Sequence, residues 1–555
     1  MSATLVLTNG RIYTMDSYQP TATAVAIRDG KILAVGDDQA MRALLGKNGE
    51  WVDLGGRCVT PGLVDAHVHF QGYALSLQRV NLAGTATLDE ALQRVAAKMA
   101  DDGRPATGDG WLEGRGWAQD EWTGRHFPTA AHLDSVVPHL PVCLRDKSGH
   151  AAWVNSRALH IAAIDARTPD PPGGSIQRDG DNRPTGILFE EAIDLVTRHI
   201  PATTLVQLVT AMRQAQVRCW QAGLTGIHDF DGRTCFQVLQ ILRQAGELGL
   251  RVVKNVPVYR LDHAIGVGLR TGFGDDWLRI GGVKIFADGA LGPRTAAMIA
   301  PYENEPGNYG MTVTDKEEMM AYASQASASG LSVTVHAIGD RANHDVLDVY
   351  EAVRAEERQQ LERSNPQSPM EHRPMAHRPI PNLLHRIEHV QLLHPDDLHR
   401  LAQLNVIASM QPIHATSDME MADRYWGGRA RNSYAWRTVL NSGATLVFGS
   451  DAPVEPIEPL LGIHAAVTRR RPDGSPGANG WYPEQRLTMP ETIHAFTRAA
   501  AITSGQEARQ GSITPGKLAD LTIFERDIFT VPPDELLDVG IAATVVGGEF
   551  KYRTW

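Results

Sequence analysis

His67 and His69 stand two positions apart in the apolar segment 63–70, which reads LVDAHVHF. Side chains two apart on a β-strand point to the same face, so two imidazoles at this spacing can reach one metal ion. Such a pair is a weak signal alone, because a histidine near a strand end can also bond to a backbone group. Three further candidates each stand in another strand-like segment: His336, His389 and Asp451. The whole set predicts a metal site.

The predicted metal site offers nitrogen and oxygen donors, which suit Zn²⁺ or a similar divalent ion. Water on such an ion has its pKa lowered to about 7, which provides a hydroxide nucleophile at neutral pH. Asp451 would take the proton and pass it to a leaving nitrogen, as a general acid and base. The alternative for Asp451 is a strand-end carboxylate that caps the next loop.

Eight strand-like segments alternate with helix-like segments through the middle of the chain. They are residues 63–70, 224–230, 251–259, 280–288, 331–339, 385–391, 405–412 and 445–451. Eight strand–helix units predict an α/β protein with a TIM-like (β/α)8 barrel, in which catalytic groups sit at the carboxyl ends of the strands. The polar candidates fall at those ends. A doubly wound open sheet would also show alternating strands and helices, but that fold gives no reason for ligands on so many separate strands.

The two ends of the chain share a strand-rich texture. Residues 3–59 contain short strands with a hairpin signal at Arg28-Asp29-Gly30, and 519–527 and 542–553 are similar. Because a short β segment cannot bury a face alone, we expect the two ends to form one composite β-sandwich. Two unrelated edge elements are the alternative.

These patterns predict a nested domain layout. Residues 1–59 and 505–555 form the sandwich, and 60–504 form the metal-hydrolase barrel. The stretch 71–223 is far longer than a crossover requires, so it contains an α+β insertion, with a hairpin around Gly180-Asp181-Asn182. Residues 355–384 are rich in proline and charge and are predicted to be an exposed loop.

Composition narrows the class of partner. The chain has 555 residues, of which 21% are charged and 43% hydrophobic, as in soluble globular proteins. A formal net charge of −11 argues against a nucleic-acid or anionic-membrane binder and favours a small-molecule partner. No membrane span or secretory leader is evident, so we expect a cytoplasmic protein. The four cysteines show no CxxC spacing, which argues against a disulfide framework or thiolate zinc site.

Several motifs together carry a family resemblance. They include PGLVDAHVHF (61–70), GHAAWVNSRAL (149–159), GGVKIFADGALGPRTAAM (281–298), VHAIGDRA (335–342), RIEHVQ (386–391) and FGSDAPVEP. The chain resembles the amidohydrolase superfamily, and within it the amidohydrolase family 3, or YtcJ-like, branch related to N-substituted formamide deformylase. The resemblance spans nearly the whole chain. It implies a metal-dependent barrel with a composite β-sandwich.

The resemblance also implies the ligands. His67, His69 and Asp451 would hold a first metal with Lys284, while His336 and His389 hold a second. Members with two metals carbamylate the lysine with CO2, which makes a bridging carboxylate. The alternative is a plain Lys284 paired with a carboxylate such as Asp288, beside a single metal ion.

Substrate contacts follow from the matching motifs: His150, Trp153, Trp117, His228, Arg294, His414 and Asp418. Aromatic walls suit an apolar acyl or aryl group. The alternatives for His228 are that it orients a metal ligand through a hydrogen bond or that it makes a purely structural hydrogen bond. The other histidines between 372 and 400 are expected to be solvated: His372, His377, His385, His394 and His399.

The leading hypothesis is a zinc-dependent hydrolase of a non-peptide C–N bond, in an amide, N-formyl or N-acyl amine. An esterase, lactonase, carbamate hydrolase or deaminase on the same barrel is the first alternative. A regulatory relative without catalysis is the second, although all five His and Asp ligand candidates are present. The family favours homodimers.

Overall fold

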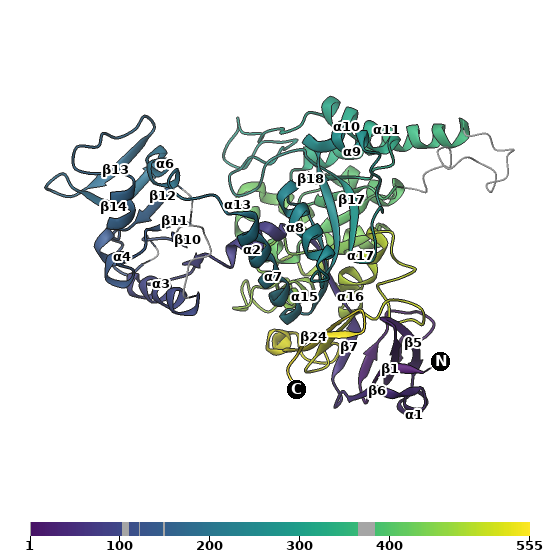
Figure 1. Cartoon of the computed structure of the whole chain (residues 1–555). Coiled ribbons are helices and arrows are strands. Elements are labelled where there is room, and N and C mark those ends of the chain that lie inside the picture. The colour runs from purple at the N-terminus through teal and green to yellow at the C-terminus, as the bar shows by residue number, and fades with distance from the viewer. Residues whose placement is uncertain (1, 103–109, 121, 148–149, 364–382) are drawn as a thin grey trace. The chain divides into compact units, whose positions relative to one another are not determined.

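The computed structural model describes residues 2–102, 110–120, 122–147, 150–363 and 383–555. The chain forms two compact units, one of residues 1–70 with 216–555 and the other of residues 71–215. The first unit holds an eight-stranded parallel sheet and two smaller sheets, and the second holds a mixed sheet of its own (Figure 1).

The eight-stranded sheet is built from the eight segments that the sequence predicts as strands. They are β8 (Leu63–Val68), β15 (Leu224–Asp229), β16 (Arg251–Pro257), β17 (Leu278–Phe286), β18 (Val333–Ala337), β19 (Arg386–His389), β20 (Ile407–Met410) and β21 (Leu446–Phe448). Each strand pairs in parallel with the next along the chain. The edges β8 and β21 approach at their carboxyl ends, where the Asp451 N–H donates to the His67 carbonyl at 2.7 Å. The prediction of a TIM-like barrel is confirmed.

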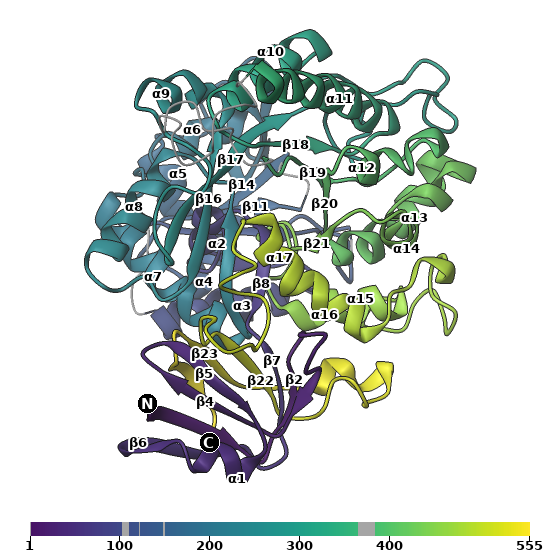
Figure 2. The same cartoon turned by 90° about the vertical axis from the view of Figure 1, so that its right-hand side faces the viewer.

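Helices cover the outside of the barrel (Figure 2). The strands are therefore enclosed on both faces; in β15, LTGIHD, every residue is buried. Helix α8 (Arg233–Gln244) shows how a helix packs there, because its buried residues Cys235, Val238, Leu239 and Leu242 follow the three-and-four spacing of one helical face. Such packing leaves the interior of the barrel to side chains from alternate strand positions.

The two ends of the chain meet in one β-sandwich. One sheet has the order β5 (Lys31–Gly36), β4 (Ala24–Arg28), β1 (Ala3–Thr8), β6 (Leu45–Asp53). The other has the order β24 (Glu549–Arg553), β23 (Ile541–Val546), β22 (Leu521–Phe524), β7 (Cys58–Pro61), β2 (Arg11–Tyr13), β3 (Thr21–Ala22). Antiparallel pairing of β7 with β22 joins the ends, as the neighbouring purple and yellow segments show in Figures 1 and 2.

An apolar cluster fills the space between the two sheets of the sandwich. It includes Leu7 and Ile27 from the first sheet and Ile523 and Val545 from the second. The alternative of two unrelated edge elements is therefore wrong. The predicted hairpin at residues 28–30 joins β4 to β5, with positive φ angles at Asp29 and Gly30 that suit a tight two-residue turn.

The insertion unit is a mixed sheet with helices. Its strand order is β13 (Gly174–Arg178), β14 (Pro184–Glu190), β12 (Ala151–Val154), β11 (Val142–Asp146), β10 (Leu112–Trp117), β9 (Val80–Asn81). Helices α3 (Leu88–Asp102), α4 (Ala130–Val136), α5 (Ser156–Ile161) and α6 (Asp194–Thr197) accompany it. The hairpin predicted around residues 180–182 is the β13–β14 pair.

The polar stretch 355–384, which the sequence predicts to be a loop, begins as a helix. Helix α11 (Asp340–Arg363) continues through its first residues, because the run of charged and glutamine side chains there favours a solvated helix. Residues 364–382, with His372 and His377, lie outside the described residues.

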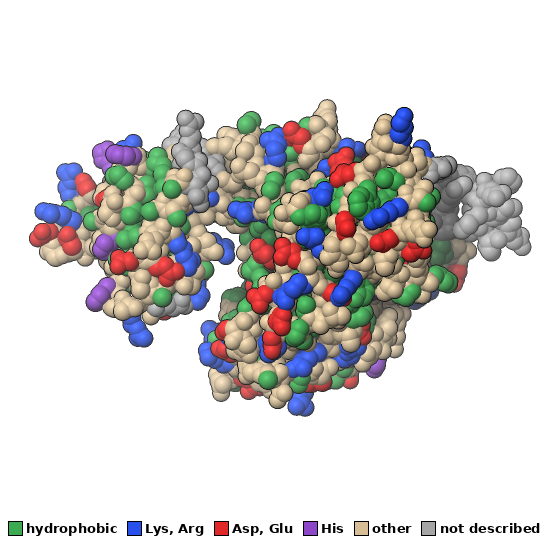
Figure 3. All heavy atoms as spheres, turned by 90° about the horizontal axis from the view of Figure 1, so that it is seen from below, with side chains coloured by type: hydrophobic (Ala, Val, Ile, Leu, Met, Phe, Trp, Pro, Cys, Tyr) green, Lys and Arg blue, Asp and Glu red, His purple; other side chains and the backbone are tan. Residues whose placement is uncertain are grey.

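All four cysteines are buried thiols, and no described helix is long and apolar enough to cross a membrane. Acidic and basic side chains are interspersed on the face shown in Figure 3.

Candidate metal centre

The predicted metal ligands gather at the carboxyl ends of the barrel strands. His67 lies on β8 with His69 just beyond it, Lys284 on β17, His336 on β18, His389 at the end of β19 and Asp451 after β21. One ligand atom from each of His67, His389 and Asp451 lies within 4.8 Å of the other two. Asp451 Oδ1 is 3.5 Å from Nε2 of both His67 and His69. The ring centroids of His336 and His389 are 4.6 Å apart.

Hydrogen bonds from outside the cluster orient three of the imidazoles. The pairs are His67 Nδ1–Glu388 Oε2 at 2.6 Å, His69 Nδ1–Asp231 Oδ1 at 3.1 Å and His389 Nδ1–Gln411 Oε1 at 2.8 Å. Each partner is an acceptor, so the proton sits on Nδ1 and the lone pair on Nε2. In His336 the arrangement is reversed, because Nε2 donates to the Gly289 carbonyl at 2.9 Å, so the lone pair is on Nδ1.

The buried Nε2 of His67 shows that a metal ion fits this cluster. Among the described residues this nitrogen has no hydrogen-bond partner. A buried polar atom without a partner costs about 1–3 kcal/mol, unless a ligand satisfies it. Imidazole and carboxylate donors are the ligands that Zn²⁺ and similar divalent ions take. The residues therefore fit a divalent cation.

Burial sets the protonation of His67, His336 and His389, whereas at His69 the lowering of the pKa by burial is outweighed by Asp231 and Asp451, which raise it. At the other three histidines burial prevails. It lowers the pKa of His67 to about 4 and that of His336 to about 3, and it lowers the pKa of His389 well below its ordinary value. These imidazoles are therefore neutral at pH 7, which is the form that binds metal.

Asp451 is held as a carboxylate. Burial alone would raise its pKa, but the nearby His67 and the hydrogen bond from His414 outweigh burial and place the pKa below the usual range. The backbone at His389 and Asp451 has φ of 74° and 62°, a left-handed conformation that is uncommon for residues other than glycine. Strained positions of this kind cluster at functional sites.

Lys284 lies beside the cluster without an acidic partner in contact among the described residues. Its Nζ lies 4.7 Å from the ring centre of Phe230 and 4.8 Å from that of Phe286. Burial lowers its pKa to about 8. Asp288 instead accepts backbone N–H groups, including those of Ile338 and Gly339 at 3.0 and 2.8 Å. The alternative of a Lys284–Asp288 ion pair is therefore wrong.

Among the described residues, His414 is a predicted substrate residue that contacts a ligand candidate directly. It lies in the first turn of α13 (Pro412–Trp426), with Nε2 3.3 Å from Asp451 Oδ2 and Nδ1 3.2 Å from Glu455 Oε1. Burial would lower its pKa, but these two carboxylates raise it to about 10. One turn later, Asp418 accepts a hydrogen bond from the Tyr434 hydroxyl at 2.6 Å.

Residues 50–552 match the sequence model described as the amidohydrolase family. The chain belongs to the amidohydrolase family. This amidohydrolase is 34% identical to Protein LONG AFTER FAR-RED 3 of Arabidopsis thaliana, over 99% of this chain and 92% of the relative. It is 32% identical to the putative amidohydrolase YtcJ of Bacillus subtilis, over 98% of each chain.

Two further relatives of this amidohydrolase bear on its chemistry. The N-substituted formamide deformylase of Arthrobacter pascens is 27% identical over 99% of this chain and 98% of the relative. The crystal structure of an uncharacterised metal-dependent hydrolase from Pyrococcus horikoshii superposes with a TM-score of 0.74 at 28% identity, covering 95% of this chain and 99% of that one.

Two of the predicted substrate residues of this amidohydrolase lie in the core of the insertion unit. Trp117 and Trp153 are completely buried, with ring centroids 6.3 Å apart. Their indole N–H groups donate to the carbonyls of Leu144 and Thr129. In this structure they stabilise the unit and present no surface to a ligand.

The other predicted contacts are spread more widely. His150 is exposed in the insertion unit, with Nδ1 2.9 Å from Glu190 Oε2. Arg294 pairs with Glu305 in the segment after β17. His228 is buried inside the barrel, with Nδ1 3.0 Å from Arg386 Nη1.

Sequence reasoning missed the acceptors that orient the ligands in this amidohydrolase: Asp231, Glu388 and Gln411. Each stands within two residues of the carboxyl end of a strand, so a polar acceptor at that end is the signal that could have found it. His385 was expected to be solvated, but it is completely buried, with Nε2 2.9 Å from Glu357 Oε1. A carboxylate partner explains how the barrel wall accommodates it.

Proposed function

We propose that this amidohydrolase is a metal-dependent hydrolase of non-peptide C–N bonds, in an amide, N-formyl or N-acyl amine. The observation that carries the proposal is the arrangement around Asp451, whose carboxylate faces three imidazoles while the His67 Nε2 has no hydrogen-bond partner in the described part of the chain. The full-length relationship to an N-substituted formamide deformylase supports the choice of bond.

The ligand set would be His67, His69, Lys284, His336, His389 and Asp451, holding one or two ions, which we propose to be Zn²⁺. When bound, such an ion supplies Lewis acidity and a nucleophilic hydroxide at neutral pH. A second ion needs a bridging anion, and carbamylation of Lys284 by CO2 would supply it. The amine reacts with CO2 in its neutral form, and burial favours that form at Lys284.

Asp451 would move the proton. Its carboxylate is ionised in the resting protein, so it can accept a proton from the attacking water and return it to the leaving nitrogen. His414 donates to the other carboxylate oxygen and fixes the rotation of the group. A leaving amine must be protonated before it departs, and this is why a group that both accepts and donates is needed for C–N cleavage.

Phe286 would contact the substrate. It is two residues from Lys284 on β17, so both side chains point to the same face of the strand, and its ring lies 5.2 Å from that of His336. The side chain remains 43% exposed. A half-exposed aromatic ring beside the ligands suits an apolar acyl or N-substituent.

A hydrolysis screen tests the proposed function. Zinc-loaded protein is offered matched panels of N-formyl amines, N-acyl amines, carbamates, esters and amino-substituted rings, with separate detection of amine, carboxylate and ammonia. Turnover should appear with formyl or acyl amines and disappear in Asp451→Asn. Turnover confined to esters, or release of ammonia from rings, would replace the proposed bond by one of the other hydrolytic reactions.

The control variant is His385→Asn. This buried histidine also pairs with a carboxylate, but it bonds to Glu357 and to the Val333 N–H rather than to the ligand cluster. Activity should persist in His385→Asn and be lost in Asp451→Asn. Loss in both would mean that any buried disturbance of the barrel abolishes turnover.

A further inference from the structure

A column of polar side chains continues inside the barrel from the candidate metal ligands toward the opposite end. Its members are Glu388, Arg386 and His228. Arg386 and Glu388 are two apart on β19 and therefore point to the same face of that strand. All three side chains are buried, and Glu388 has no exposed surface at all.

Glu388 holds His67 with a fully occupied carboxylate. Its Oε2 accepts from His67 Nδ1 at 2.6 Å and from Arg386 Nη2 at 2.9 Å, while its Oε1 accepts from Thr334 Oγ1 at 2.5 Å. Contacts from three directions prevent the carboxylate from rotating. The His67 ring is consequently fixed with Nε2 toward the other ligand candidates.

Arg386 is itself anchored at several points. Its Nη2 also donates to the Ala66 carbonyl at 2.8 Å and to Ser409 Oγ at 2.6 Å, and its Nη1 donates to His228 Nδ1 at 3.0 Å. A guanidinium has donors only, so His228 Nδ1 must be the acceptor and the His228 proton must lie on Nε2.

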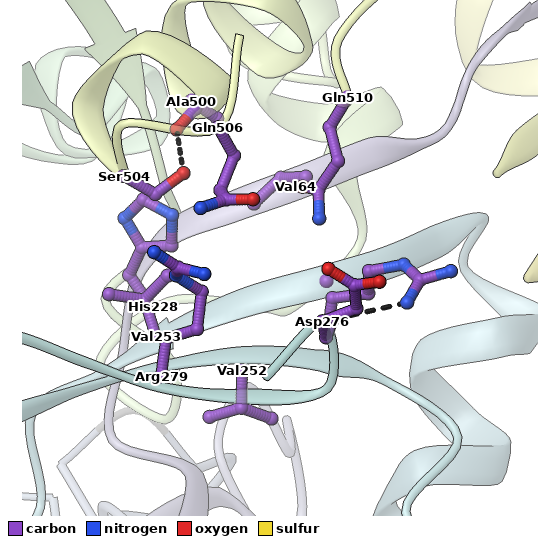
Figure 4. A pocket seen from close by; sticks show the side chains of 12 residues that line it. Val64, His228, Val252, Val253, Asp276, Arg279, Ala500, Ser504, Gln506 and Gln510 are labelled. Atoms are coloured by element: carbon purple, nitrogen blue, oxygen red, sulfur yellow. Dashed lines mark hydrogen bonds between the residues drawn. The ribbon is translucent and has the colours of Figure 1, made fainter. Parts of the chain in front are cut away.

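His228 lies at the end of the column farthest from the ligands. Arg386, its partner, is the first residue of β19, whereas the ligand candidate His389 is the last. His228 also lines a small cavity together with Val64 and Val252, which are the second residues of β8 and β16 (Figure 4). His228 is the fifth of the six residues of β15, near the carboxyl end of that strand, but the contacts that the described residues give its ring are with Arg386 and this cavity.

We propose that His228 is a positioning residue that sets the metal affinity of the candidate site. By accepting from Arg386 it holds the guanidinium that fixes both Glu388 and the Ala66 carbonyl next to His67. The inference rests on the metal site of the proposed function and is independent of the bond that is cleaved. Partners that orient a ligand from outside typically change metal affinity by 10- to 100-fold when they are lost.

The test compares Zn²⁺ affinities, measured on the full chain by competition with a chromophoric chelator. His228→Leu removes the acceptor and should weaken Zn²⁺ binding about tenfold. His228→Asn places an amide oxygen near the position of Nδ1 and should restore most of the affinity. Ser409→Ala, a smaller change that removes another Arg386 bond, should weaken binding severalfold.

The control is His385→Leu, one residue from Arg386 on the chain, where a buried histidine is also lost but the column is intact. It should bind Zn²⁺ as wild type does. Unchanged affinity in Ser409→Ala and in folded His228→Leu would overturn the proposal. Equal losses in His228→Leu and His385→Leu would also overturn it, because the effect would then be one of packing. Zn²⁺ affinity is read without substrate, so a failed hydrolysis screen leaves this result standing.

Discussion

Replacement of His228 by asparagine should change how the stability of the protein depends on pH. Burial, followed by the charge of Arg386, lowers the pKa of His228 to about 3 in the folded protein. In the unfolded chain a histidine has a pKa of about 6.5. Asparagine can keep the acceptor for Arg386 but cannot take up a proton.

The magnitude follows from the interval between the two pKa values. Below pH 6.5 the unfolded chain binds a proton at His228 that the folded protein does not bind, so the free energy of unfolding falls as the pH falls. At pH 5 the difference is 1.5 pH units at about 1.36 kcal/mol each, or about 2 kcal/mol. Because the folded pKa lies well below 5, its exact value has little effect on this figure.

The assay is urea unfolding of metal-free wild type and His228→Asn at pH 8 and pH 5, followed by circular dichroism. Burial raises the pKa values of Asp65 and Asp288 to about 7, so these two residues increase the free energy of unfolding as the pH falls, opposite to His228. His414, whose pKa is also raised, acts in the same direction as the two aspartates. Those contributions cancel when the two proteins are compared at the same pH. Relative to wild type, the variant should gain about 2 kcal/mol between pH 8 and pH 5.

An equal difference between the two proteins at both pH values would refute the reasoning. It would mean that His228 binds its proton as readily in the folded protein as in the unfolded chain. The deduced acceptor role of Nδ1 toward Arg386 would then fail as well.

Three further predictions concern the candidate metal centre. His67→Ala should lose both bound metal, measured by elemental analysis, and turnover, measured by the hydrolysis assay. Asp451→Asn should lose turnover. Full activity in His67→Ala would contradict the ligand assignment. Phe286→Ala should lower kcat/KM for aryl-substituted substrates about 2- to 10-fold, from about 0.5–1.5 kcal/mol of aromatic contact, and leave N-methyl analogues unchanged; an equal loss for both would rule out the contact. Native mass spectrometry of the metal-loaded protein should show an added CO2 that is absent in Lys284→Met, and an unmodified mass with two bound ions would exclude the carbamylated bridge.

The barrel could be predicted because its signals are local. Each strand is an apolar run with polar residues at its end, and the two-residue spacing of His67 and His69 fixes their shared face. The sandwich was predictable for a similar reason, since neither end of the chain has enough strand to bury a face alone.

The partners of the ligands could not be predicted because they come from other strands. Glu388 bonds to His67 across 321 positions of the chain, and Asp231 bonds to His69 across 162. Nothing in the spacing of either residue specifies that approach, which only the closed barrel provides. The tryptophans of the insertion were misjudged because an aromatic residue in a core and one in a pocket have the same local pattern.

The central claim is that His67, His389 and Asp451 belong to one metal centre. Anomalous diffraction at the zinc edge from zinc-loaded crystals tests it most directly. A peak should lie within bonding distance of the His67 Nε2, with ligands from β8, β19 and the segment after β21. Stoichiometric zinc located elsewhere, or a His67 Nε2 that bonds to protein instead, would contradict it.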